Sequence, residues 1–328
     1  MKIGTIGTGF IVDTFLHAIA HQPGIEVTCM YTRNETSAQS LAHKYQIKKI
    51  YTNLEDLLND NEIDTIYVAS PNSLHYQQAK AALLAGKNVI CEKPFTTTIS
   101  QLDDLIETVK KTKTYLFEAI TTIHLPNYQA LKPYLDSIKP IRYIDCNFSK
   151  YSSRYTNFIE GETPNIFNPD FSGGALMDLN IYNLHFVMNL FGKPNQATYF
   201  ANMQRGIDTS GIAVLQYDGF IASCISCKDS DGKSIGMISG EKGTIMVDST
   251  SGAHNVEINI QGKKTCFNLQ NPEMNNLYYE LGAFNQIIKN QEFEKMIEKL
   301  NYSKSVYEVI SKMRKDCGLI FKDDKNLD

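Results

Sequence analysis

Two alternating hydrophobic periods in the first 120 residues constrain the fold of this chain more than any other feature. Short apolar runs of strand length alternate with amphipathic stretches of helical length. Alternation at this spacing produces right-handed βαβ units, in which parallel strands form one sheet covered by helices on both faces. The predicted strands are residues 2–7, 26–31, 64–70, 88–92 and 115–118, and the predicted helices are residues 14–21, 36–45, 73–85 and 100–111.

The pattern changes after about residue 122. Strand-length runs broken by Gly and Asp occupy much of the second half, and Asp218-Gly219 between two of them is a strong hairpin signal. We therefore predict an α/β protein with a doubly wound parallel sheet over residues 1–120 and an α+β domain with an open, mostly antiparallel sheet over residues 121–328. The predicted elements of the second half are helices 174–191, 276–289 and 303–321 and strands 213–217, 221–227, 234–239 and 244–247.

Composition excludes several classes of protein. The 328 residues are 42% hydrophobic and 21% charged, as in ordinary globular domains, and the formal net charge of −4 argues against nucleic acid or an anionic membrane as a partner. Neither a secretory signal nor an apolar stretch of about 20 residues is visible. The seven cysteines are an odd number in mostly strand-like surroundings, which indicates reduced thiols and a cytoplasmic protein.

Two glycines lie where the first predicted strand meets the first helix. In Gly7-Thr8-Gly9, the first glycine allows a tight turn and the second lets the backbone approach a pyrophosphate. The helix start beyond the glycines offers free N–H groups and a positive dipole end to that anion. We therefore predict that Gly7, Gly9, Phe10 and Ile11 bind a dinucleotide.

The end of the second predicted strand selects the cofactor. An NAD site usually has an acidic residue about 20 positions beyond the glycines, which accepts a hydrogen bond from the ribose 2′-OH. Here the chain reads Thr32-Arg33-Asn34, and the first carboxylate is Glu35. Because no acid repels a 2′-phosphate, and because Thr32 and Arg33 can donate to it, the sequence favours NADP, with NAD as the alternative.

Two further predicted strands end in polar side chains. Ligands of open parallel sheets bind outside the carboxyl ends of the strands, so these side chains are candidates for cofactor contacts. Pro94 disfavours helical geometry at Lys93, so the Lys93 ammonium can project over this edge, although a solvated strand cap is the alternative reading. The candidate side chains are Ser70, Asn72, His75, Glu92 and Lys93.

Taken together, these motifs resemble the Gfo/Idh/MocA oxidoreductase family. The segments that carry the resemblance over nearly the whole chain are Gly7-Thr8-Gly9, Ser70-Pro71-Asn72 with His75, Glu92-Lys93-Pro94, and the glycine-led stretch from Gly173-Gly174 through Asp178 and Asn180 to Tyr182. Tyr182, where many members have His, is similar to the branch of dimeric dihydrodiol dehydrogenases and NADP-linked pentose dehydrogenases.

The resemblance implies a Rossmann domain followed by a domain for substrate binding and oligomerisation. It implies hydride exchange between NADP(H), or less readily NAD(H), and a CH–OH or C=O group of a sugar, polyol or related diol. A homodimer or higher homo-oligomer is implied as well, with the open sheet face as the contact surface. Two departures, Asn180 in place of the usual Gly and Ile123 in place of a common Arg, add bulk beside the site and remove a cation. Substrate identity is therefore not carried over.

Asp178 and Tyr182 are four residues apart, so they share one face of a helix. An ammonium near Tyr182 favours the phenolate of a group whose ordinary pKa is about 10. We predict that Tyr182 exchanges a proton with the reacting oxygen, that Lys93 stabilises charge there, and that Asp178 orients the substrate or Tyr182. The alternative for Tyr182 is a core aromatic, and His185, nearly one turn further, could line the same cleft or be a core histidine.

Other functions have weaker support in the residues. Cys224-x-x-Cys227 lies in a strand-like run, where residues three apart face opposite sides, and no second pair stands at ligand spacing, so no metal is predicted. A sugar-sensing or redox-sensing regulator that kept the cofactor would not need Lys93, Asp178 and Tyr182 together. An eliminating or hydrolytic enzyme with tightly held NAD is disfavoured by the missing acid after the second strand.

Overall fold

The computed structural model describes residues 1–327, which form two compact units. Unit 1 contains residues 1–119 and 272–304, and unit 2 contains residues 120–271 and those from 305 onward. The sequence predicts one division, near residue 120. In the structure the chain also returns to unit 1 at residue 272 and leaves it again after residue 304.

Unit 1 is built on a six-stranded parallel sheet in the order β3-β2-β1-β4-β5-β6. The predicted doubly wound sheet is thereby confirmed, because this is the strand order of dinucleotide-binding folds, with the crossover between β1 and β4. β3 has only three residues, too few to show a period in the sequence. The strands are β1 (Lys2–Ile6), β2 (Glu26–Tyr31), β3 (Lys49–Tyr51), β4 (Thr65–Val68), β5 (Asn88–Glu92) and β6 (Leu116–Ala119).

Helices cover this sheet, and two of them, α10 (Leu277–Lys289) and the first half of α11 (Phe293–Asp316), come from far along the sequence. Gln22 donates to the carbonyl of Tyr278 at 2.5 Å, and Asn275 donates to the carbonyl of Thr14 at 2.9 Å, so the chain after residue 272 is tied to the first helix. These contacts explain why residues 272–304 belong to unit 1. Its helices are α1 (Phe10–Ile19), α2 (Thr36–Lys44), α3 (Leu54–Leu58), the 3₁₀ turn η1 (Asn72–Leu74), α4 (His75–Leu84), α5 (Ile99–Thr112), α10 (Leu277–Lys289) and the first half of α11 (Phe293–Asp316).

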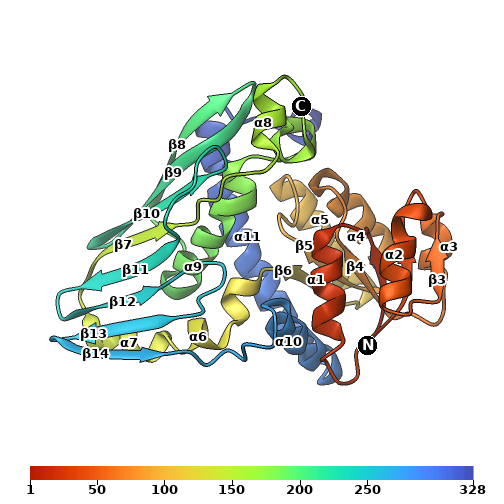
Figure 1. Cartoon of the computed structure of the whole chain (residues 1–328), viewed down its shortest axis with the longest axis horizontal. Helices are drawn as coiled ribbons and strands as arrows, with labels where there is room; N and C mark the ends of the chain where they lie inside the picture. Colours follow the sequence, from red (N-terminus) through yellow and green to blue (C-terminus); the bar gives the residue numbers. More distant parts are fainter. Residues whose placement is uncertain (328) are drawn as a thin grey trace. The chain divides into compact units, whose positions relative to one another are not determined.

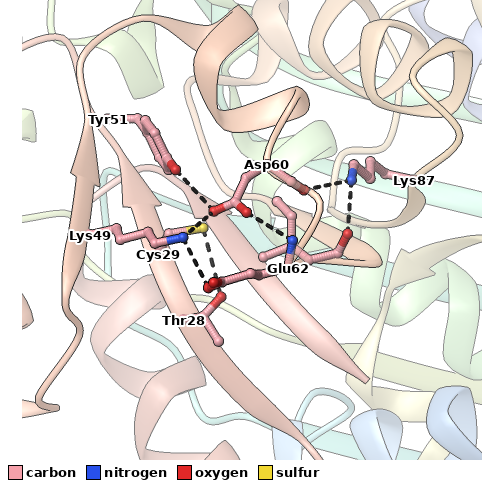
Figure 2. A network of polar contacts seen from close by, with 8 residues as sticks. Thr28, Cys29, Lys49, Tyr51, Asp60, Glu62 and Lys87 are labelled. Carbon is pink, nitrogen blue, oxygen red and sulfur yellow. Dashed lines mark hydrogen bonds and ion pairs between the residues drawn. The ribbon is translucent and has the colours of Figure 1, made fainter.

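A polar network holds the short edge strand β3 (Figure 2). The Lys49 ammonium lies 3.1 Å from a carboxylate oxygen of Asp60 and 2.9 Å from one of Glu62, and Tyr51 donates to Asp60 at 2.9 Å. Lys87, which is buried, donates at 2.8 Å to the backbone carbonyls of Asp60 and Ile63. Because these charged groups bond to one another and to the backbone, the network stabilises the edge of the sheet.

Unit 2 contains an eight-stranded sheet in the order β14-β13-β12-β11-β7-β10-β9-β8 (Figure 1). Only the β7–β10 pair is parallel, so the predicted mostly antiparallel sheet is confirmed. The hairpin at Asp218-Gly219 is present, with Tyr217 paired to Phe220 and Gly219 at φ +85°. The strands are β7 (Ile141–Asn147), β8 (Gln196–Gln204), β9 (Ile207–Tyr217), β10 (Phe220–Cys227), β11 (Ile235–Gly240), β12 (Gly243–Val247), β13 (Val256–Ile260) and β14 (Lys263–Phe267).

One face of this sheet is covered and the other is open. Ile144, Ile238 and Ile258 are buried on the helix-covered face, whereas Phe200 is 65% exposed and Ile212 is 41% exposed on the other. The helical elements of unit 2 are η2 (Thr121–His124), α6 (Pro126–Gln129), α7 (Lys132–Ile138), α8 (Tyr155–Ile159), η3 (Asn165–Phe167), η4 (Pro169–Phe171), the π-helical turn η5 (Leu176–Asn180), α9 (Ile181–Phe191), the second half of α11 and η6 (Asp323–Leu327).

The seven cysteines are free thiols, as predicted from their number and surroundings. Cys224 is buried and Cys227 is partly exposed, because side chains three apart on β10 face opposite sides of the sheet. Among the helices of residues 1–327, none is both long and apolar enough to cross a membrane.

Candidate functional site

The turn after β1 has the geometry that its glycine predicts. Gly7 has φ +116°, and a Cβ there would lie 2.5 Å from the carbonyl oxygen of Ala69. Its N–H donates to the carbonyl of Tyr31 at 3.1 Å, which holds the turn against the end of β2. Only glycine fits this position, because any other side chain would collide with the backbone that follows β4.

The start of α1 provides an open approach to a helix N-terminus. Gly9 is the N-cap of this ten-residue helix, and a Cβ added at Gly9 would meet no atom within 4 Å. Phe10 is exposed and Ile11 is partly exposed in the first turn. The turn and the open helix start therefore fit the pyrophosphate of a dinucleotide, which the N–H groups and the helix dipole would bind.

Hydroxyl groups gather beside the end of β2. The oxygens of Thr32 and Ser37 lie 2.8 Å apart, and Thr8 donates to Ser37 at 3.4 Å. Arg33 is exposed next to them, and so is Glu35. Thr8 and Ser37 were not predicted as site residues. The sequence signal for them is a hydroxyl in the glycine turn and another in the first turn of α2.

His75 connects the loops after β4 and β5. The ring is buried, with Nδ1 2.9 Å from the carbonyl oxygen of Pro94 and Nε2 2.8 Å from that of Ser70. Burial lowers the pKa of His75, and a neutral imidazole donates to one of the two carbonyls. His75 thus positions the loops that carry Asn72 and Lys93, while its predicted contact with the cofactor stays a prediction.

Glu92 is buried, whereas the next residue, Lys93, is partly exposed. Tyr67 donates to Glu92 at 2.5 Å, and burial raises the pKa of the Glu92 carboxyl to about 7. Glu280 of α10 is buried nearby, and burial together with the charges of Glu92 and Glu118 raises its pKa as well. Glu92 therefore belongs to a buried acidic cluster of unit 1, and its predicted contact with the cofactor also remains a prediction.

In unit 2, a buried carboxylate fixes the start of the glycine-led helix. Gly174 has φ +99°, and a Cβ there would lie 1.9 Å from Oδ1 of Asp208. Oδ2 of Asp208 accepts from the backbone N–H of Leu176 at 2.7 Å and from the hydroxyl of Tyr199 at 2.8 Å. Burial raises the pKa of Asp208 to about 6. Asp208 was not predicted from the sequence, because it lies 32 residues after Leu176 and no local pattern connects the two.

Asp178 and Tyr182 are the accessible side chains at the start of this helix. The other four residues of η5 are buried, as are Ile181 and Asn183 on either side of Tyr182. The Tyr182 ring meets Phe148 edge to face, with centroids 5.4 Å apart. Two accessible positions four residues apart are what a shared face requires, and π-helical turns are frequent at functional sites.

The carboxylate of Asp178 forms an ion pair with Lys228, a residue that the sequence analysis missed. The Lys228 side chain is only 4% exposed, whereas that of Asp178 is 30% exposed. Lys228 follows the last residue of β10, 50 residues after its partner in the chain. No local pattern connects two residues at that separation, so only the fold brings them together.

Comparison with known proteins identifies the family. Residues 1–119 match the Gfo/Idh/MocA oxidoreductase family with its NAD-binding Rossmann fold, and residues 137–246 match the Gfo/Idh/MocA C-terminal domain. The chain belongs to the Gfo/Idh/MocA family. The resemblance seen in the motifs is confirmed over both units.

Relatives within the Gfo/Idh/MocA family match the chain over its full length. It is 32% identical over 328 residues to the uncharacterized oxidoreductase YgjR of Escherichia coli, covering 99% of this chain and 98% of the relative. It is 31% identical to the scyllo-inositol 2-dehydrogenase (NADP(+)) IolU of Bacillus subtilis, covering 99% of both. The solved structure of KijD10, a 3-ketoreductase from Actinomadura kijaniata in complex with TDP-benzene and NADP, has the same fold, with a TM-score of 0.82, 22% identity and 96% coverage of both chains.

The structure explains what happens at the two positions that depart from the Gfo/Idh/MocA pattern. Asn180 was expected to add bulk beside the site, but its side chain is fully buried, donates to the carbonyl of Cys224 at 2.9 Å and accepts from Asn183 at 2.9 Å. A buried amide must find such partners, and the sheet supplies them. Ile123, the second departure, is buried. His185 is fully buried as well, which favours the interpretation of His185 as a core histidine.

Proposed function

We propose that this protein is an NADP(H)-dependent oxidoreductase that exchanges a hydride with a CH–OH or C=O group of a sugar, polyol or related diol. The observation that carries the cofactor preference is the group of hydroxyls beside Arg33 at the end of β2, where an NAD site usually has a carboxylate. The full-length similarity to IolU, whose name specifies a cyclic polyol and NADP(+), supports both the cofactor and the substrate class.

In this proposal unit 1 holds the cofactor through three features of its sheet edge. The N-terminus of α1 with Gly7 and Gly9 receives the pyrophosphate, because the approach there is open and the first N–H groups of a helix have no partner within the helix. Arg33 and Thr32 donate to the 2′-phosphate. An ionised acceptor strengthens such hydrogen bonds roughly twofold over neutral ones.

The chemistry assigned to the chain is movement of a proton at the substrate oxygen. When bound, NADP would supply the hydride acceptor or donor. In the oxidising direction Tyr182 takes the hydroxyl proton while Lys93 stabilises the developing alkoxide; in the reducing direction Tyr182 returns the proton to the carbonyl oxygen. Asp178 orients the substrate through a hydroxyl group.

The open sheet face of unit 2 is the surface proposed for self-association into a homodimer or higher homo-oligomer. Phe200 and Ile212 are paired across β8 and β9, and both are exposed. This pair supports the assignment, because large contiguous patches of exposed apolar side chains mark interaction surfaces. Light scattering coupled to gel filtration should give a mass above that of one chain, and Ile212→Asp should shift it towards one chain. A parent protein of one-chain mass would contradict this assignment.

The proposed function is tested by measuring the change in absorbance of the nicotinamide cofactor when the purified protein is incubated with candidate substrates. Cyclic polyols, aldoses and vicinal diols are offered with NADP⁺ and with NAD⁺, and the matching ketones with NADPH. We expect turnover with at least one class, faster with NADP(H), and its loss in Lys93→Met. Lys110→Met, which removes an exposed lysine paired with Glu107, is the matched control and should leave the rate unchanged.

Three outcomes would contradict the proposal. NADP binding without turnover of any substrate would indicate a cofactor-dependent sensor. Consumption of substrate without net change of nicotinamide absorbance would indicate an eliminating or hydrolytic enzyme. Turnover of the Lys93→Met protein within a few-fold of the parent would show that the Lys93 ammonium is only a solvated cap of β5.

A further inference from the structure

The ion pair between Lys228 and Asp178 joins a hidden cation to an accessible carboxylate. Both backbone polar groups of Lys228 are hydrogen-bonded. Its N–H donates to the carbonyl of Thr209 at 2.8 Å, and its carbonyl accepts from the N–H of Ser152 at 2.8 Å. The ammonium also lies 5.8 Å from the ring centroid of Phe167. The burial of its side chain and the hydrogen bonds of its backbone therefore restrain Lys228 within unit 2, and its ammonium holds the Asp178 carboxylate.

The gain in folding free energy from an ion pair of this kind is too small to explain why Lys228 is buried. Removing an ammonium from water is unfavourable, and an ion pair with one partner near solvent offsets only part of that cost. Such a pair is therefore weak evidence of stabilisation. The pair Arg314–Asp324 provides a contrast in the same unit. There the Arg314 side chain is 1% exposed and that of Asp324 is 9% exposed, the guanidinium contacts both carboxylate oxygens, and the pair ties η6 to α11. Lys228 instead orients a carboxylate that remains accessible.

We infer that Lys228 is a positioning residue for the reaction, acting through Asp178. The ammonium holds the Asp178 carboxylate in one orientation, so that it presents a hydrogen-bond acceptor beside Tyr182 on the same helix face. Lys228 itself is too buried to meet the substrate. This inference rests on the proposed oxidoreductase function, in which Asp178 orients the substrate.

A double-mutant cycle on kcat and KM tests the inference. Lys228→Met should lower kcat by about 10²-fold, the cost of a misplaced orienting group, while NADP affinity stays within about twofold. In the Asp178→Asn protein, adding Lys228→Met should change kcat by less than about threefold, because Lys228 would have no carboxylate left to position. A purely structural lysine would instead cost the same factor in both backgrounds.

Two further variants keep the test decisive. Lys228→Arg keeps the charge and protects the fold while displacing the cation, and its effect on kcat should likewise disappear in the Asp178→Asn background. Asp324→Asn breaks the structural ion pair and should lower the melting temperature without changing kcat of the folded protein. Two results would overturn this inference and leave the proposed function standing. One is an equal loss of kcat from a Lys228 substitution in the parent and in the Asp178→Asn protein. The other is a kcat of the Lys228→Met protein within threefold of that of an active parent. An inactive parent would overturn the proposed function and this inference with it.

Discussion

The buried carboxylate of Asp208 accepts a hydrogen bond from the backbone N–H of Leu176 at 2.7 Å, and so anchors the turn that carries Asp178. Burial raises its pKa from 3.8 to about 6 in the folded protein. A raised pKa means that the folded state binds the proton more tightly. The contribution of this group to stability is therefore fully present below about pH 4 and is lost as the pH rises through 6.

The Asp208→Asn variant should reveal that titration. Asn keeps an acceptor oxygen for Leu176 but carries no charge, so relative to the parent the variant should gain about 2 kcal/mol in unfolding free energy between pH 4 and pH 7.5. Urea unfolding of both proteins at several pH values measures the difference, in which all other titrating groups cancel. A difference that does not change with pH would contradict the assignment.

The Asn180→Ala variant should lose stability and not catalytic chemistry. Asn180 bonds to Cys224 and Asn183 in the core, and losing both hydrogen bonds should cost about 2 kcal/mol of unfolding free energy. Asn195→Ala, which removes an exposed hydrogen bond to Asp218, should cost less than about 0.5 kcal/mol. Denaturant melts measure both. Equal effects of the two changes would show that the buried amide network is unimportant.

The Arg33→Ala variant should weaken binding of NADP far more than binding of NAD. Loss of a charged hydrogen bond to the 2′-phosphate should cost about 1–3 kcal/mol of binding free energy for NADP. Because Arg33 is exposed, the unfolding free energy should stay within about 0.5 kcal/mol of the parent value. Calorimetric titration with both cofactors provides the comparison. Equal affinities of the parent protein for NADP and NAD would refute the preference.

The Tyr182→Phe variant should separate packing from proton transfer. The ring and its contact with Phe148 are kept, so stability should fall by at most about 0.5–1.5 kcal/mol. If the hydroxyl transfers the proton, kcat should fall by about 10²–10⁴-fold. NADP affinity should barely change. Steady-state rates and cofactor titrations check this. A rate equal to that of the parent would mean that Lys93 or a water molecule delivers the proton.

The sequence by itself determined the elements whose patterns are local. The period of strands and helices predicts the parallel sheet of unit 1, and Gly7 predicts the tight turn at the end of β1. The Asp218-Gly219 pair predicts the hairpin between β9 and β10. In these cases the physical cause, a side-chain period or a positive φ, acts within a few residues and so is visible in a short stretch of sequence.

Only the tertiary structure decided which distant residues surround the predicted ones. Lys228 reaches Asp178 across 50 residues of sequence, and Asp208 reaches Leu176 across 32. The return of residues 272–304 to unit 1 depends on contacts between α10 and α1. Such contacts are set by how sheets and helices pack, and by the need of buried polar groups for partners, which no local period records.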